Sequence, residues 1–94
     1  MTMEKIKSYQ RTISGRVQNV GFRFHTQDEA IKLGIKGFVA NMPDGSVYIE
    51  AEGTEDQINP FIIWCHKGPN WAKVSAVKIV EQPLSGFQLF KIKR

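Results

Sequence analysis

The nine residues from Gly15 to Arg23, GRVQNVGFR, are the feature that most restricts how this chain can fold. They follow an apolar alternation and precede a helical pattern, so they predict a glycine-flanked turn between a strand and a helix. Gly15 and Gly21 reach backbone angles that are closed to other residues, and Asn19 is one of the few residues that tolerates positive φ. Consecutive N–H groups in such a turn can point inward, and the start of a helix adds further unpaired donors. The run therefore predicts a turn suited to phosphate, with the guanidinium of Arg23 beside it.

Apolar periodicity and turn signals predict the remaining elements. Asp44-Gly45 lies between two strand-like runs, which is a hairpin signal, and Thr54 with Gln57 has the spacing of a capping box that opens a helix. Gly34 is placed as the C-terminal cap of the helix before it. In chain order we expect a strand containing Tyr9, Ile13 and Val17, a helix over 22–33, a strand over 35–42, a strand through 47–51, a helix from 54 to 67, and strands around 74–79 and 87–93.

This order predicts an α+β fold, the ferredoxin-like βαββαβ sandwich, in which an antiparallel sheet carries both helices on one face. The 94 residues suffice for a single domain, 1–94, with a core that needs no metal or disulfide. A strand-helix-strand crossover is right-handed, so the carboxyl ends of the first two strands emerge at the same edge. Asn41 is therefore expected near the turn. It shares strand parity with Val39 and could face a ligand there; equally, it could be a turn-forming residue before Pro43.

Composition indicates a protein of the reducing cytoplasm with no membrane segment. No apolar run approaches the roughly 20 residues of a membrane span, and the N-terminus lacks the apolar stretch of a signal peptide. Cys65 is the only cysteine and cannot form an internal disulfide, and its apolar helical surroundings indicate a buried structural thiol. The net charge of +4 favours anionic partners, from small phosphorylated molecules to nucleic acid.

Other polar and aromatic residues are predicted to take no direct part in chemistry. His25 lies two residues after Arg23 and therefore faces another side of the helix, so we expect no general-base role for it. The two histidines and the cysteine lack the spacing of metal ligands, so we expect no metal site. Phe22 and Phe38 are expected in the core, and Arg16 is expected to be a solvated strand residue.

Three motifs together resemble the acylphosphatase family: Gly15 to Arg23, then Gly37-Phe38-Val39-Ala40-Asn41, then Asp44-Gly45-Ser46-Val47. The stretches Thr54 to Trp64 and Phe90-Lys91-Ile92 extend the resemblance over nearly the whole chain. It implies hydrolysis of acyl phosphates, R-CO-OPO3, to a carboxylate and inorganic phosphate by direct attack of water. It also implies that the enzyme uses no cofactor, no metal and no covalent intermediate.

The resemblance assigns roles to particular residues. The phosphoryl group is expected to be held by Arg23 and by the loop amides, which belong to Gln18, Asn19, Val20, Gly21 and Phe22. Asn41 matches the asparagine that orients the attacking water. Inorganic phosphate or sulfate is expected to compete with the acyl phosphate substrate, and the protein is expected to be a monomer. Asn19 replaces the family's usual glycine, and Ala40 replaces a frequent arginine; neither change is expected to abolish the chemistry.

Two alternatives belong to other classes of protein. RNA-recognition domains share the βαββαβ order, and Lys36-Gly37-Phe38-Val39 is weakly similar to their basic-Gly-aromatic signature. That signature falls on the second strand rather than the third and lacks the aromatic residues that should follow, so we expect no nucleic-acid partner. The other alternative is the acylphosphatase-like module of hydrogenase maturation proteins. The sequence has one cysteine and therefore lacks the zinc-finger cysteines of those proteins, so a free-standing enzyme is the simpler interpretation.

Overall fold

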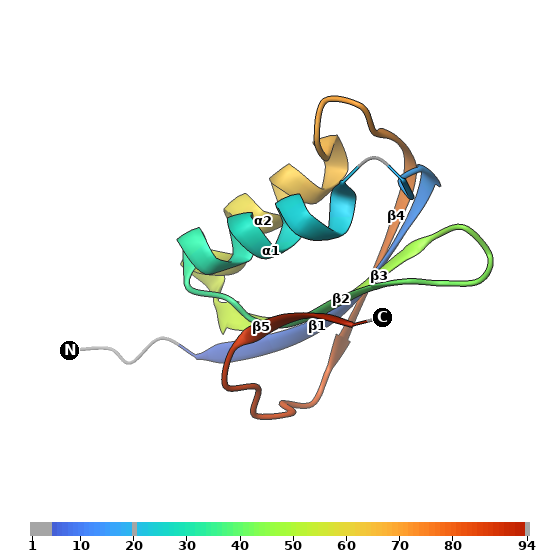
Figure 1. The fold of residues 1–94 in the computed structure, drawn as a ribbon. Helices are drawn as coiled ribbons and strands as arrows, with labels where there is room; N and C mark the ends of the chain where they lie inside the picture. The colour runs from blue at the N-terminus through green and yellow to red at the C-terminus, as the bar shows by residue number, and fades with distance from the viewer. Residues whose placement is uncertain (1–4, 20, 94) are drawn as a thin grey trace.

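The computed structural model describes residues 5–19 and 21–93, and both helices cover the same face of one five-stranded sheet (Figure 1). The strands lie in the order β4-β1-β3-β2-β5. Along the chain the elements are β1 (Ile6–Arg16), α1 (Phe22–Leu33), β2 (Lys36–Asn41), β3 (Val47–Thr54), α2 (Glu55–Lys67), β4 (Lys73–Gln82) and β5 (Phe90–Lys93). The predicted ferredoxin-like α+β architecture is confirmed. Among the described residues, neither helix has the length and apolarity needed to cross a lipid bilayer.

The sheet is mixed, which differs from the antiparallel sheet that the sequence predicts. β1 pairs antiparallel with β3 and β4, and β2 pairs antiparallel with β3, whereas β5 runs parallel to β2. The reason is topological: β4 ends at the end of the sheet where β2 begins, so a strand that starts there and lies beside β2 shares its direction. β5 is also shorter than the predicted 87–93, because the N–H of Phe87 donates to the Glu52 carboxylate, 3.2 Å away, before the strand begins.

Helix ends follow the local signals in the sequence. Gly34 adopts the left-handed conformation at the end of α1, and its N–H donates to the carbonyl of Ile31 at 3.2 Å. Thr54 and Gln57 form the predicted capping box at the start of α2, each side chain accepting a hydrogen bond from the backbone N–H of the other residue. These caps fix where the helices begin and end against the sheet.

The core lies between the helices and the sheet. Phe22 and Cys65 are both buried there as predicted, and burial raises the pKa of the Cys65 thiol to about 12. Phe38 is not in this core, because strand parity places its neighbour Val39 on the helix side. Phe38 lies on the opposite face of the sheet, where its ring meets those of Tyr48 and Phe87. The buried apolar residues are Ile13, Val17, Phe22, Ala30, Ile35, Val39, Val47, Ile49, Ala51, Ile58, Phe61, Cys65 and Phe90.

Among the described residues, two charged side chains are buried away from the predicted site. Arg11 of β1 is 0% exposed, and its three guanidinium nitrogens have no hydrogen-bond partner in the described part of the chain. The group lies 5.5 Å from the ring centre of Tyr9 and 5.4 Å from that of Phe61. Glu52 of β3 accepts hydrogen bonds from the backbone N–H groups of Ser85, Gly86 and Phe87. Burial favours a higher pKa for Glu52, but these bonds outweigh it and hold the pKa below its usual value.

Strand direction places the carboxyl ends of β1 and β2 close to each other. β1 and β2 both run antiparallel to β3, so their carboxyl ends lie at the same edge of the sheet. Arg16 ends β1 just before the glycine-flanked turn, and Asn41 ends β2. The predicted meeting of the turn and Asn41 at one edge therefore follows from the observed topology.

Candidate active site

The turn between β1 and α1 has the backbone that the sequence predicts. Gly15, Asn19 and Gly21 have φ values of 123°, 61° and 75°. Asn19 is the one non-glycine residue with positive φ among residues 5–19 and 21–93, so the asparagine occupies the left-handed region in place of a glycine. The predicted part of Val20 in phosphate binding falls outside the described residues.

The start of α1 offers unpaired donors without a cap or a nearby negative charge. Its first helical hydrogen bond runs from the N–H of His25 to the carbonyl of Gly21, at 3.0 Å, so the N–H groups of Phe22, Arg23 and Phe24 precede the helical pattern. Gly21 supplies no side-chain cap, and the first turn of α1 contains no acidic residue. By contrast, α2 has both a capping box and two acidic residues in its first turn. The amino end of α1 is therefore the one left open for an external anion.

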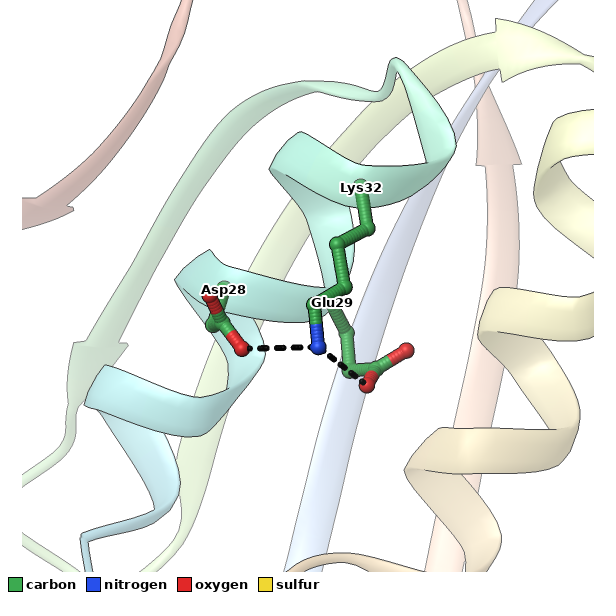
Figure 2. Close-up of polar contacts among 3 residues, drawn as sticks. All are labelled: Asp28, Glu29 and Lys32. Atoms are coloured by element: carbon green, nitrogen blue, oxygen red, sulfur yellow. Dashed lines mark ion pairs between the residues drawn. The ribbon is translucent and has the colours of Figure 1, made fainter.

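Arg23 adds a full positive charge at this helix end. The side chain is half-buried in the first turn of α1. Within the described part of the chain, ion pairs involve only Lys32, whose Nζ lies 3.2 Å from Asp28 and 3.9 Å from Glu29 (Figure 2). Arg23 has no carboxylate partner among these residues, so its guanidinium is not neutralised by a neighbouring side chain.

Asn41 carries a buried carboxamide oxygen, Oδ1, that has no hydrogen-bond partner among the described residues. The turn that follows is formed by another side chain: the carboxylate of Asp44 accepts from the N–H of Ser46 at 2.9 Å and from its hydroxyl at 2.6 Å. A turn-forming asparagine would bond the backbone a few residues on, as Asp44 does here. The geometry therefore favours the ligand-facing interpretation of Asn41, since buried polar atoms in native proteins nearly always have a partner.

The side chain of Gln18 joins the turn to the β2–β3 hairpin. Its Nε2 donates to the carbonyl of Met42 at 2.8 Å and to the carbonyl of Ser46 at 2.9 Å. Met42 is the residue after Asn41, so these two bonds fix the turn against the strand end that carries the carboxamide. The sequence predicts only a backbone role for Gln18. The bonded residues lie 24 and 28 positions away along the chain, and no local pattern indicates such a contact.

The arrangement can hold a tetrahedral anion between a backbone turn, a helix end and a guanidinium, with a neutral carboxamide at the adjoining strand end. Its donors are main-chain N–H groups and Arg23, which suit phosphoryl oxygens. Among residues 5–19 and 21–93, no three His, Cys, Asp or Glu side chains come together as metal ligands would. The ring of Phe22 is buried in the core, so this residue can reach a ligand only through its N–H group.

Comparison with known proteins places the chain among closely similar sequences and structures. The family model for acylphosphatase matches residues 9–92. An acylphosphatase of Aliivibrio fischeri is 44% identical over 87 residues, covering 89% of this chain and 97% of that protein. The crystal structure of acylphosphatase from Bacillus subtilis superposes with a TM-score of 0.91 at 36% identity, covering 96% of this chain and all of the other. Full-length HypF in its phosphate- and nucleotide-bound form gives a TM-score of 0.92 at 32% identity, over 99% of this chain and 12% of that one.

Proposed function

Because the chain belongs to the acylphosphatase family, we propose that the turn after β1, Arg23 and Asn41 are the active site of an acyl phosphate hydrolase. Enzymes of this family hydrolyse acyl phosphates, and the chain is such a hydrolase. The assignment of roles to these residues is supported by the geometry of the turn, the open helix end and the buried carboxamide.

The first task of the site is to hold and neutralise the phosphoryl group. The N–H groups of Gln18, Asn19, Gly21 and Phe22 surround one side of it, and the guanidinium of Arg23 contacts two of its oxygens. Negative charge on the equatorial oxygens is stabilised in the transition state by these fixed donors, which is the main work of catalysis in phosphoryl transfer. A lysine at position 23 would supply charge without the planar fork, so it would serve less well.

The second task is to position water. Asn41 accepts a hydrogen bond from the attacking water through Oδ1, which is the atom left without a partner in the described residues. A bond forms between the water oxygen and phosphorus while the bond from phosphorus to the acyl oxygen breaks, and both protons of the water stay on the phosphate product. The leaving carboxylate has a conjugate acid with a pKa of about 4, so it departs near neutral pH without a general acid. The unpartnered carboxamide oxygen of Asn41 is the single observation that turns an anion site into a proposed hydrolytic one.

The test is hydrolysis of benzoyl phosphate by Arg23→Ala, Arg23→Lys and Asn41→Ala variants. We expect Arg23→Ala to lower kcat/KM by about 10³-fold or more and to weaken inhibition by inorganic phosphate. Asn41→Ala should lower kcat by roughly 10²- to 10³-fold, the range for loss of one transition-state hydrogen bond, with phosphate inhibition nearly unchanged. Arg16→Ala is the matched control, since Arg16 is an exposed arginine next to the turn and should retain activity.

Particular outcomes would contradict this assignment. Parent-like turnover by Asn41→Ala would remove the water-positioning role, and an Arg16→Ala defect equal to that of Arg23→Ala would show that only nearby charge matters. A salt-dependent titration with single-stranded RNA runs alongside, because salt-sensitive binding without hydrolysis would favour the nucleic-acid module.

The finer properties of the enzyme are also proposals. We propose that residues 1–94 act as one domain and as a monomer in the cytoplasm, with inorganic phosphate or sulfate competing for the turn. The near-complete coverage of the Aliivibrio fischeri relative supports the single domain, and the lone buried Cys65 suits a reducing compartment. Sedimentation equilibrium should give the mass of one chain, and fractionation of the source cells should recover the activity with the cytosol.

A further inference from the structure

A cleft lies beside the proposed active site, between the two helices and the segment that joins α2 to β4. Its volume is about 300 Å³, at the lower end of the range for small-molecule sites. Its walls include His25 and Glu29 of α1, Trp64 and Lys67 of α2, and Asn70 and Trp71 of the joining segment. None of these residues belongs to the proposed phosphate site, so the cleft has no assigned role in the reaction as described above.

Two contacts connect this cleft to the turn. A methyl group on Gly21 would lie 3.4 Å from Cδ2 of His25, so the imidazole packs against the turn. A methyl group on Gly68 would lie 2.6 Å from Cε2 of Phe22, so the joining segment packs on the residue before Arg23. The cleft and the turn are therefore adjacent. In Figure 1 the α2–β4 loop lies beside the start of α1.

The order of the strands decides on which side of the turn the cleft lies. β1 lies between β4 and β3, with β2 beyond β3. Asn41 and the β2–β3 hairpin are therefore on one side of the turn that follows β1, and the segment leading into β4 is on the other. In-line displacement at phosphorus places the entering water and the leaving group on opposite sides. Water positioned by Asn41 consequently directs the leaving acyl group toward the cleft.

The lining of the cleft indicates which acyl groups it suits. Trp71 is 81% exposed, the highest exposed fraction among the large apolar side chains of the described residues. The walls carry one negative charge, on Glu29, and one positive charge, on Lys67, and Glu29 also lies near Lys32 (Figure 2). Because the charges of the walls are of both signs, they favour neither an anionic nor a cationic acyl group. An uncovered indole face favours a flat apolar group that can stack on it.

We propose that this cleft binds the acyl part of the substrate and that Trp71 gives the enzyme a preference for acyl phosphates with aromatic or other flat apolar acyl groups. The proposal rests on the proposed function, since it assigns the leaving-group side of the same site. Trp71 contacts the acyl group and not the phosphoryl group. Its contribution is the same before and during bond breaking, so it changes KM more than kcat.

The experiment compares benzoyl phosphate with acetyl phosphate, which share the phosphoryl end and differ only in the acyl group. Trp71→Ala should lower kcat/KM for benzoyl phosphate by about tenfold, mainly through KM, while changing acetyl phosphate hydrolysis by less than about twofold. Trp71→Phe keeps an aromatic face and should restore most of the preference. Ile63→Ala is the matched control, because Ile63 is 71% exposed on α2 and does not line the cleft.

Each result bears on one claim. An equal loss for both substrates in Trp71→Ala would overturn the acyl-group subsite while leaving the hydrolase intact. The proposal would also be overturned if the parent preferred succinyl phosphate to benzoyl phosphate and lost this preference in Lys67→Ala. That result would show that the cleft selects anionic acyl groups. Failure of the parent to hydrolyse either acetyl or benzoyl phosphate would instead refute the proposed function.

Discussion

Removing the side chain of Gln18 should uncouple the turn from the β2–β3 hairpin. In Gln18→Ala two hydrogen bonds are lost, those from Nε2 to the carbonyls of Met42 and Ser46. Each such bond contributes about 0.5–1.5 kcal/mol. Both carbonyls keep another donor, since Gly45 N–H bonds Met42 at 3.1 Å and Met42 N–H bonds Ser46 at 2.9 Å. No acceptor loses its last partner, so no desolvation penalty is added and we expect the free energy of unfolding to fall by about 1–3 kcal/mol.

Catalysis should be affected as well as stability. The bonds from Gln18 set the distance between the amides of the turn and Asn41, and a displacement of about 1 Å in such a site can cost 10²-fold in rate. We therefore expect kcat/KM for benzoyl phosphate to fall by about 10- to 100-fold. Urea denaturation measures the stability, and steady-state kinetics at a temperature where the variant is fully folded measure the rate.

Gln27→Ala is the matched control for this variant. Gln27 is also a glutamine whose Nε2 donates to a backbone carbonyl, that of Phe90 at 3.2 Å, but it lies further along α1 and contacts β5. Its loss should lower stability by about 0.5–1.5 kcal/mol and leave kcat/KM within about twofold. If Gln18→Ala loses stability yet retains kcat/KM as Gln27→Ala does, the side chain of Gln18 does not position the turn.

Three further variants test other features of the structure. Glu52→Gln should lower the free energy of unfolding by about 1–3 kcal/mol above pH 5, because the carboxylate bonds three N–H groups. The pKa of Glu52 is lower in the folded state, so the stability difference between parent and variant should shrink as the pH falls below 4.5. A stability difference that does not change with pH, or an equal one in the exposed control Glu81→Gln, would contradict a stabilising role for the Glu52 carboxylate. Arg11→Met should raise stability by about 1–3 kcal/mol in urea, because a buried guanidinium without hydrogen-bond partners is replaced by an apolar chain; a loss of stability would refute this. Asn19→Gly should leave kcat/KM within a few-fold, since both residues reach positive φ, and a large gain would mean that Asn19 strains the turn.

Local signals predicted most of the fold. The left-handed positions at Asn19 and Gly34 and the capping box at Thr54 depend on residues a few positions apart, so the sequence contains everything that determines them. Alternation along the first strand also placed Ile13 and Val17 on one face, and both are buried. The prediction that Phe38 lies in the core was wrong, because it rested on residue type, whereas alternation with buried Val39 places Phe38 on the other face of the sheet.

The sequence predicted which residues belong to the candidate site, but not the contacts between residues far apart in the chain. The turn, Arg23 and Asn41 were expected at one edge because crossover handedness requires it. The choice between the two interpretations of Asn41 depends on the structure. There, Oδ1 is buried with no hydrogen-bond partner among the described residues, and the turn is formed by Asp44 instead. The cleft beside Trp71 likewise had no sequence signal, because its walls come from three separate segments.

The amino-acid sequence suffices to predict the order of the elements, the glycine-flanked turn between β1 and α1 and the residue types available to that turn. These features arise from backbone preferences and periodicities over a few residues, which are encoded locally. The tertiary structure alone decided the parallel pairing of β5, the bonds from Gln18 to the hairpin and the position of the cleft relative to Asn41. Those features join residues dozens of positions apart, and their geometry is fixed only when the two helices pack on the sheet and bring the segments together.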